Sequence, residues 1–352
     1  MRLLAITCVK NEGAFLLDWL AHLRALGFSD ILVFSNDCDD GTDAMLERLQ
    51  ALGHLTHQPN PGPWAEGPQW AALKAADRHP LRRAADWVMF LDIDEFPVVH
   101  LGDGTLPALI AALPEADAIT LTWRMFGNCG VVSAADTPPG AQFTRAAPTR
   151  MRWPWRVQMF KTMFRANAGY RKLGVHRPRG LEPGAAPRWF DGSGRELPEL
   201  FRRNRLFSLM GEDNYQLAQL NHYALGSMEN YVVKCDRGRS NRAAAPFDMS
   251  YWVERNFCTE EDRTIARYDA AVAPLRAELG ADAELAALHA RALAWRRERF
   301  EALMAQEEAR ALFGRLLITP PSRPMPRALE DRIVGYGLRA KAAQQETIGP
   351  DP

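Results

Sequence analysis

The sequence predicts an α/β fold in which a largely parallel β-sheet carries helices on both faces. Short runs of consecutive apolar residues, typical of buried strands, alternate between residues 3 and 123 with segments whose apolar residues recur at helical spacing. Polar residues directly follow three of the apolar runs. An alternation of this kind is typical of a sheet between two helical layers, and ligands of such sheets lie outside the carboxyl ends of the strands.

The predicted elements follow one another as strand, helix, strand and helix. The expected strands span residues 3–9, 31–34, 87–91 and 118–123, and the expected helices span residues 14–26, 42–52 and 68–76. Gly27 and Gly53 follow the first two helices, as glycine often does at a helix C-terminus. Pro68 opens the third helix, where its missing N–H leaves no hydrogen bond unmade.

The pattern becomes irregular from about residue 124 to residue 198. Gly, Pro, Trp and Arg are frequent there, and we expect irregular segments with short strands near residues 158–165 and 189–190. Beyond residue 259 the chain is rich in Ala, Glu, Arg and Leu at helical spacing, which predicts helices as far as Gly314. The tail from Thr319 is rich in proline, and we expect its end to be loose.

Composition excludes several classes of protein. The 352 residues include 43 Lys plus Arg and 43 Asp plus Glu, so net charge gives no drive toward nucleic acid or an anionic membrane. The five cysteines are widely spaced without a CxxC pair, which suggests neither a disulfide framework nor a zinc ribbon. No apolar run reaches about 18 residues, and the N-terminus lacks a signal-peptide pattern. We therefore expect a cytoplasmic protein without a transmembrane segment.

The segment WVMFLDIDEF, residues 87–96, ends an apolar strand in a cluster of carboxylates. Asp92 and Asp94 are two positions apart, so in an extended chain both point to the same face. Adjacent carboxylates repel each other unless a positive group lies between them. Mg²⁺ or Mn²⁺ would fill that place, since such ions take oxygen ligands from one or two carboxylates and from substrate phosphates. The bound ion would clamp a diphosphate and neutralise charge on a leaving group.

Other interpretations of these carboxylates stay open or can be set aside. Acidic residues after a strand also cap helices or line solvated loops. Asp37 cannot begin a calcium loop, because Thr42 and Arg48 replace the required glycine and glutamate. A DxD-type phosphohydrolase would use Asp92 as nucleophile, but Phe96 does not suit that motif, which also belongs on a first strand. The phosphate-loop and dinucleotide fingerprints are absent.

Three segments together resemble the glycosyltransferase family 2 proteins with the GT-A fold, and in particular a bacterial branch that also resembles family 92. They are CVKNEGAFLLDWLAHLRALGF, ILVFSNDCDDGTDAML and WVMFLDIDEF. The likeness is strong over residues 3–130 and weaker through HRP at 176–178 and NHY at 221–223. It implies a mixed, mainly parallel sheet and a metal-dependent transfer of a sugar from a nucleotide-sugar donor, in the hexosyltransferase class and in polysaccharide biosynthesis.

The resemblance also implies a division of the chain. Residues 1–130 would be the nucleotide-sugar-binding half of the GT-A domain, residues 131–258 the acceptor-side half, and residues 259–352 a helical C-terminal extension. The acceptor would be a saccharide or lipid-linked glycan. No nucleic-acid partner is expected, and peripheral association with a membrane stays open.

Several residues match positions that bind the donor in the resembling family. They are Asn11 and Glu12 after the first strand, Asn36 and Asp37 after the second, and Gln69 at the start of the third helix. Asp92 and Asp94 match the metal motif, and His222 is a candidate third ligand. The alternative for Asp37 is a turn before a helix cap, and that for Gln69 is an ordinary helix start.

The remaining candidates come from the second half of the chain. Lys234 and Arg237 could hold the diphosphate, although a solvated basic face is the alternative. If the reaction inverts the anomeric centre, a carboxylate must take the proton of the acceptor hydroxyl. Glu212 and Asp213 are the nearest candidates, although two acids before Asn214 also suit a turn. A non-catalytic module that binds a nucleotide-sugar without turnover is a further alternative.

Overall fold

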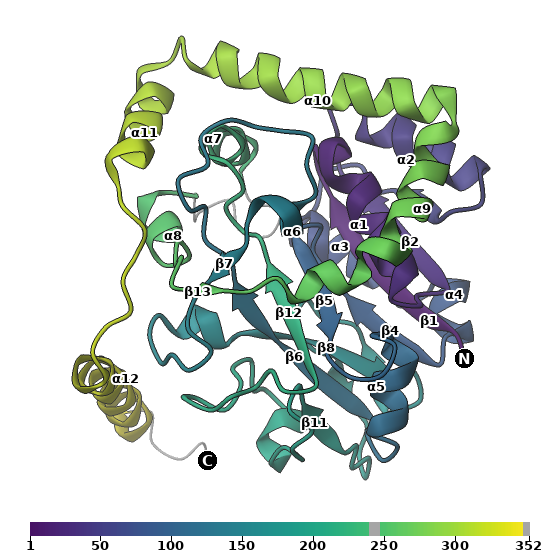
Figure 1. Ribbon diagram of the computed structural model, residues 1–352. Coiled ribbons are helices and arrows are strands. Elements are labelled where there is room, and N and C mark those ends of the chain that lie inside the picture. Colours follow the sequence, from purple (N-terminus) through teal and green to yellow (C-terminus); the bar gives the residue numbers. More distant parts are fainter. Residues whose placement is uncertain (239–246, 348–352) are drawn as a thin grey trace.

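A mixed β-sheet forms the centre of the molecule in the computed structural model (Figure 1). The structure describes residues 1–238 and 247–347, with side chains as far as residue 340. Within these ranges, nine strands form the sheet in the order β3-β2-β1-β4-β8-β6-β12-β5, and β11 pairs with β6 beside β12. The strands are β1 (Leu3–Val9), β2 (Asp30–Ser35), β3 (Thr56–Pro59), β4 (Trp87–Phe90), β5 (Glu95–Val99), β6 (Ala118–Met125), β8 (Phe160–Arg165), β11 (Trp189–Asp191) and β12 (Ala218–His222).

The predicted fold class, a mainly parallel sheet flanked by helices, is confirmed. Strands β3, β2, β1 and β4 run parallel, as do β6, β11 and β12. Strand β8 runs antiparallel between β4 and β6, and β5 is an antiparallel edge strand beside β12. Two small ribbons lie outside this sheet: β7 (Arg145–Ala146) with β13 (Glu260–Glu261), and β9 (Tyr170–Lys172) with β10 (Arg179–Leu181).

Both faces of the sheet are buried, because successive side chains of β1 enter two different hydrophobic cores. The first core is covered by α1 (Gly13–Ala25), α2 (Thr42–Ala51), α5 (Leu106–Ala112), α9 (Asp269–Ala281) and α10 (Ala283–Leu303). The second is covered by α3 (Pro68–Ala76), α4 (Pro80–Ala84), the β9–β10 ribbon and the 3₁₀ helix η2 (Glu199–Arg202). These two helical layers hold the strand ends in place.

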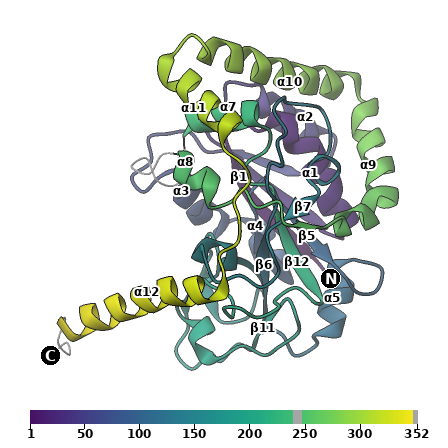
Figure 2. The same cartoon turned by 60° about the vertical axis from the view of Figure 1, so that its left-hand side comes forward.

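The remaining helices follow or border the sheet. They are α6 (Pro139–Gln142), α7 (Met228–Arg237), α8 (Met249–Val253), α11 (Glu307–Ile318), α12 (Arg327–Thr347), η1 (Trp155–Gln158) and η3 (Thr264–Tyr268). Helix α10 crosses the molecule above α2 and α7, and α12 projects away from the body (Figure 2). No helix in the described part of the chain is long and apolar enough to cross a membrane.

Every strand and helix predicted for the first 125 residues is present, with ends shifted by at most two residues. The predicted short strands are β8 and β11, and the predicted C-terminal helices are α9 to α11. Strands β5 and β12 and helices α7 and α12 were not predicted. The expected loose end of the chain, residues 348–352, lies outside the described residues. The domain division at residues 130 and 258 stays a prediction. Strands β8 and β12, which follow residue 130, belong to the same sheet as β1 and β4, which precede it.

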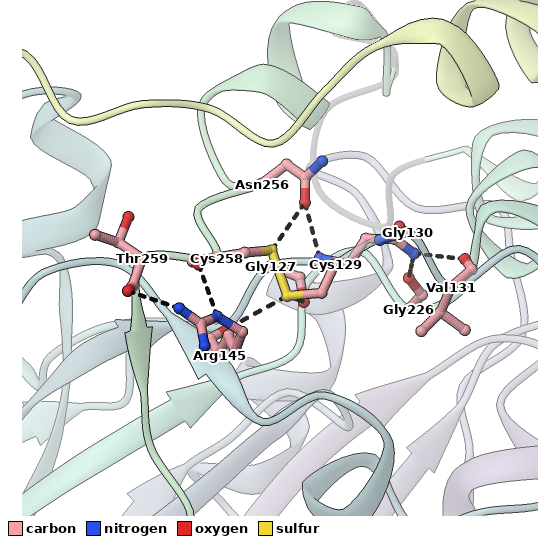
Figure 3. The surroundings of a disulfide bond; sticks show 10 residues. Gly127, Cys129, Gly130, Val131, Arg145, Gly226, Asn256, Cys258 and Thr259 are labelled. Atoms are coloured by element: carbon pink, nitrogen blue, oxygen red, sulfur yellow. Dashed lines mark hydrogen bonds between the residues drawn. A yellow bond between two sulfur atoms is a disulfide. The ribbon is translucent and has the colours of Figure 1, made fainter.

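One disulfide is present although the cysteine spacing suggested no disulfide framework (Figure 3). Cys129, just after β6, pairs with Cys258, just before β13, across 129 residues of sequence. Their Cα atoms are 5.7 Å apart, and Arg145 donates to the carbonyl of Cys258 at 2.9 Å and to that of Thr259 at 3.0 Å. Sequence spacing could not reveal this pair, because the approach of the two segments is decided by the pairing of β7 with β13.

Candidate active site

The polar residues that follow β2, β1 and β4 lie together at one edge of the sheet. These strands are neighbours and run parallel, so their carboxyl ends meet at that edge. Asn11 and Asp37, which follow β1 and β2, have positive φ angles of 54° and 45°. Non-glycine residues rarely adopt this conformation, and strained backbone of this kind clusters at functional sites. The backbone thus marks the same edge that the sequence predicted.

Two asparagines tie the ends of β1 and β2 together. The Asn11 side-chain oxygen accepts from the backbone N–H of Asp39 at 2.7 Å. The Asn36 side chain donates to the carbonyl of Val9 at 2.9 Å. Asp37 is exposed and makes no hydrogen bond or ion pair with any described residue. Of the residues predicted after β2, Asp37 is therefore the one with a carboxylate available to a ligand.

The carboxylates after β4 lie in a tight turn, which corrects the expected extended chain. The backbone N–H of Glu95 donates to the carbonyl of Asp92 at 3.1 Å. The chain reverses here because Glu95 begins β5, whose partner β12 runs antiparallel to it. Asp92 and Asp94 consequently point to different partners instead of sharing one face of a strand.

Asp92 is paired with a lysine that the sequence analysis did not single out. The ammonium of Lys161, on β8, lies 2.9 Å from Asp92 Oδ2 and 3.4 Å from Glu95 Oε2. Gln69 Nε2 donates to the other oxygen of Asp92 at 3.2 Å, which places this predicted donor residue in the cluster. The carboxylate of Glu95 stabilises the turn. It accepts hydrogen bonds from the indole N–H of Trp123 at 2.6 Å and from the backbone N–H of Asp92 at 2.8 Å.

Burial governs the protonation of Lys161 and Glu95. Burial alone would lower the pKa of Lys161, but the charges of Asp92 and Glu95 outweigh it and raise that pKa, so the lysine is an ammonium ion. Burial raises the pKa of Glu95 to about 8, against the attraction of Lys161. Near neutral pH, Glu95 is therefore mostly protonated, and the positive charge of Lys161 is balanced mainly by Asp92.

Asp94 lies between a second lysine and a histidine. The ammonium of Lys234, on α7, is 2.8 Å from Asp94 Oδ2, and His222 Nε2, at the end of β12, is 3.6 Å from Oδ1. Burial would raise the pKa of Asp94, but Lys234 and His222 hold it well below its usual value. Burial lowers the pKa of His222, so its ring is neutral and one nitrogen can act as a ligand.

The predicted metal ligands are only partly brought together. Asp94 Oδ1 and His222 Nε2 converge, whereas Asp92 is turned to Lys161 and Gln69. No group of three or more His, Cys, Asp or Glu side chains within the described ranges is arranged to hold a metal ion. A carboxylate and a neutral imidazole are nevertheless ligands that suit Mn²⁺, and Nε2 of His222 is the ring nitrogen that faces Asp94. The pair fits as part of a ligand set that substrate oxygens and water would complete.

Helices α7 and α10 bring arginines to the same strand ends. Arg237 donates to the carbonyl of Lys10 at 2.8 Å and forms an ion pair with Glu12. Arg296 of α10 donates to Asn230 at 2.7 Å and to the carbonyl of Asn11 at 3.1 Å. The Lys234 and Arg237 side chains are 13% and 14% exposed, so they are not a solvated basic face.

The predicted general-base candidates lie elsewhere. Glu212 is mostly exposed and lies 3.4 Å from Arg195, and the Asp213 carbonyl accepts from Ser193 at 2.7 Å. The Asp213 carboxylate accepts from the backbone of Tyr215 at 3.1 Å. Within the described residues neither acid contacts Asp92, Asp94 or their partners. These contacts agree with the alternative interpretation, in which the two acids belong to a turn.

Sequence reasoning missed Lys161 and Arg296. A lysine flanked by Phe160 and by the apolar residues of a short strand is a usable signal, because a buried lysine requires a carboxylate partner. Arg296 gave no signal, since it is one of many arginines in a helical segment. Only the crossing of α10 over the strand ends distinguishes it.

Comparison with known sequences gives a consistent family. The model of glycosyltransferase family 92 matches residues 5–198. A family 92 protein of Ricinus communis is 26% identical over 192 residues, which cover 49% of this chain and 33% of that protein. One of Oryza sativa subsp. japonica is 27% identical over 128 residues, covering 35% and 21%. The chain spans about a third or less of the length of these relatives.

Solved structures of low similarity were also found. Staphylococcus aureus TarS, residues 1–349, in complex with UDP, is 17% identical over 47% of each chain, with a TM-score of 0.30. Mycobacterium tuberculosis glucosyl-3-phosphoglycerate synthase, in complex with Mn²⁺, UDP and glucosyl-3-phosphoglycerate, is 17% identical over 35% of this chain and 44% of that one, with a TM-score of 0.25. At these scores the similarity is too low to place a ligand in this chain.

Proposed function

The chain belongs to glycosyltransferase family 92, and from this we propose that it transfers a sugar from a nucleotide-sugar donor to a saccharide or lipid-linked acceptor. The observation that supports the proposal most is the meeting of two acidic and two basic side chains at the strand ends, Asp92 with Lys161 and Asp94 with Lys234. Such an edge is where open α/β sheets bind their ligands. The bacterial branch stays a prediction, since the relatives named above are plant proteins.

We assign the parts of the donor to this edge. Asp37, with its exposed carboxylate, would contact the nucleoside, and Asn11 and Asn36 would shape that pocket. Lys234 would face the diphosphate from α7, where an ammonium stabilises phosphate oxygens. Arg237 and Glu12 would support that helix through their ion pair. Gln69 would orient Asp92 through its hydrogen bond.

A divalent cation, Mn²⁺ or Mg²⁺, would be held by Asp94 and His222, with Asp92 as the third predicted ligand, and would neutralise charge on the leaving diphosphate. Lys234 keeps Asp94 ionised, and burial keeps His222 neutral, which are the forms a metal requires. Lys161 offsets the charge of Asp92 whether or not an ion is present. The chain itself therefore supplies part of the positive charge of the site.

The acceptor side is supported by a pocket that adjoins Asp94. Its apolar wall includes Phe15, Phe143 and Tyr223, and Glu12 and Lys234 lie at its polar side. A wall of this kind suits the apolar face of a sugar ring. The family resemblance implies an inverting reaction, a hexose as the transferred sugar, and Glu212 or Asp213 as the general base. None of the contacts described above supports that role for either acid.

A binding experiment tests the donor site. UDP, GDP and CMP, each with and without Mn²⁺, should give a metal-dependent rise in Tm for one nucleotide, since a ligand that binds only the folded state stabilises it. Asp94→Asn should abolish the metal-dependent part of the rise. Asp269→Asn, at an exposed carboxylate on α9, is the matched control and should behave as wild type. A metal-dependent rise that survives in Asp94→Asn would place the site elsewhere.

Turnover separates the remaining alternatives. Release of nucleotide from a panel of nucleotide-sugars distinguishes an enzyme from a module that only binds the donor. A phosphohydrolase would instead form phosphorylated Asp92, which the family match does not support.

The cytoplasmic location stays a prediction, and the structure contains a disulfide that the sequence argument for it did not include. The sequence argument depended on the lack of a disulfide framework, whereas the structure pairs Cys129 with Cys258. Disulfides persist in oxidising environments and are rare in the cytosol.

A further inference from the structure

A second cavity lies on the α3 side of the sheet, apart from the carboxylate turn. It is bordered by β9 and β10, by the turn at residues 182–185 and by η2, and its volume is about 420 Å³. Small-molecule sites commonly occupy roughly 300–1,000 Å³. None of the residues that line it belongs to the predicted donor site. It is therefore a separate candidate for a ligand.

The cavity is strongly basic. Four arginines and one glutamate line it: Arg177, Arg179, Arg202, Arg203 and Glu182. Four positive charges against one negative charge leave an excess of three. Within the described residues, only one of these arginines, Arg203, has an ion-pair partner, which is Glu199 at 3.2 Å. The charge of the other three is not compensated by a nearby carboxylate at ion-pair distance.

Arg177 holds the wall of the cavity in shape. Its guanidinium donates to the carbonyl of Arg202 at 2.6 Å and stacks on Trp189, with 5.1 Å from the guanidinium carbon to the ring centroid. The hydroxyl of Tyr170 donates to the same carbonyl at 2.9 Å. The backbone from which the Arg202 side chain extends is therefore fixed by two hydrogen bonds.

Arg179 and Arg202 keep hydrogen-bond donors unused. Arg179 stacks on Trp70, 4.3 Å from the ring centroid, and donates from Nε to the carbonyl of Leu173 at 3.1 Å. Among the described residues, its two terminal nitrogens have no partner. Arg202 Nε is buried and also lacks a hydrogen bond. Buried donors nearly always have a partner, so Arg202, which lines the cavity, carries hydrogen-bonding capacity that the described residues do not use.

We propose that this cavity binds a phosphate group, held between the guanidinium groups of Arg179 and Arg202. Planar guanidinium forks match the oxygens of phosphate and form strong charge-assisted hydrogen bonds. Three lining arginines without an ion-pair partner among the described residues favour a doubly charged phosphate over a single carboxylate. The site neither shares residues with the donor site nor requires the proposed transfer reaction. Arg179 also packs on Trp70, next to Gln69 of the donor cluster, so this arginine contacts the helix that orients Asp92.

Titration calorimetry with inorganic phosphate, at ionic strength held constant with chloride, tests the proposal. Wild-type protein should bind phosphate, and Arg179→Gln/Arg202→Gln should bind it at least tenfold more weakly. Arg171→Gln, which removes an exposed charge from the same ribbon outside the cavity lining, is the matched control and should bind as wild type.

The single variant Arg202→Gln guards against a folding defect. It removes a buried, unpartnered N–H, so Tm without phosphate should not fall, while the phosphate-induced rise in Tm should be lost. The proposal is overturned if the double variant binds within twofold of wild type. It is equally overturned if Arg171→Gln weakens binding as much as the double variant, which would show a diffuse charge effect.

Discussion

Lys161 is the residue on which the acidic turn depends most directly. Its side chain is fully buried, and its ammonium lies between the carboxylates of Asp92 and Glu95. Without the lysine, the Asp92 carboxylate, which is 34% exposed, would keep water and Gln69 as its partners but lose its charge-assisted hydrogen bond. The lysine thus stabilises the fold and the predicted metal motif through the same contact.

Replacing this lysine should therefore destabilise the protein strongly. We expect Lys161→Met to lower the free energy of unfolding by about 1.5–3 kcal/mol. Lys172→Met, on the exposed ribbon strand β9, is the matched control and should change it by less than about 0.5 kcal/mol. Urea denaturation of the three proteins gives the comparison. A loss of under about 1 kcal/mol for Lys161→Met would show that the carboxylates find another partner.

His22 gives the protein a pH-dependent stability. This histidine is 3% exposed, shares a hydrogen bond of 2.8 Å with the carbonyl of Pro97, and contacts the rings of Phe96 and Tyr268. Burial lowers its pKa to about 4. Between about pH 4 and the unfolded value near 6.5, the unfolded chain therefore binds a proton that the folded chain does not, and stability falls as the pH falls through this window.

The contribution of this one group is on the order of 3 kcal/mol, which is lost by pH 4. His22→Gln can keep the hydrogen bond to the carbonyl but cannot take up the proton. We expect the variant to lose less stability than wild type between pH 7 and pH 4.5, as measured by urea denaturation at both values. If wild type and His22→Gln lose the same free energy of unfolding between these pH values, groups other than His22 cause the loss of stability in acid.

Helix α7 is the element that joins the later half of the chain to the strand ends. It carries Lys234, which contacts Asp94, and Arg237, which contacts Glu12. Ser227 caps its first turn by accepting from the backbone N–H of Asn230 at 3.1 Å, and Ser227 is fully buried. Loss of the cap would therefore leave a backbone donor unpaired at the start of the helix that carries the basic residues.

We expect Ser227→Ala to lower the free energy of unfolding by about 1 kcal/mol, and Ser227→Gly by only a few tenths, in line with their ranks as N-cap residues. If α7 positions the predicted diphosphate contact, Ser227→Ala should also weaken nucleotide binding more than Ser227→Gly does. Urea denaturation and nucleotide titration of both variants check the two parts. Equal stability of the alanine and glycine variants would contradict a capping role.

At the scale of the whole molecule, the later part of the chain completes a site that the family-matched segment begins. The match ends at residue 198, whereas His222, Lys234 and Arg296 come from beyond it. The disulfide between Cys129 and Cys258 joins these two parts covalently (Figure 3). Opening it would release a loop of 129 residues in the unfolded chain.

The disulfide should consequently raise stability. In the chain-entropy model, closing a loop of this length stabilises by up to about 5 kcal/mol. We expect a reductant, or the change Cys129→Ser/Cys258→Ser, to lower Tm, and Cys38→Ser, at a free cysteine, to leave it near wild type. Unfolded, unreduced protein should titrate with three thiols, since two of the five cysteines are paired. Five titratable thiols and a Tm that reductant does not change would contradict the pairing.

The sequence by itself determined four strands and three helices of the first 125 residues, and it predicted the edge of the sheet at which the candidate site lies. Apolar runs and helical spacing are local signals, and parallel strands bring their carboxyl ends to one edge whatever the details of packing. Asn11, Asp37, Asp92 and Asp94 were predicted in this way, and the structure places them at the ends of neighbouring strands. The two strands β5 and β12 were missed, because their pairing is between segments more than 100 residues apart.

Only the tertiary structure decided which charges compensate one another. Lys161 reaches Asp92 from β8, Lys234 reaches Asp94 from α7, and Cys258 reaches Cys129 from before β13. Each contact joins residues 69 to 140 positions apart, and a single sequence carries no signal of such a distance. The physical reason is that burial makes an unpaired charge costly, so the fold selects a partner for each carboxylate in space and not along the chain.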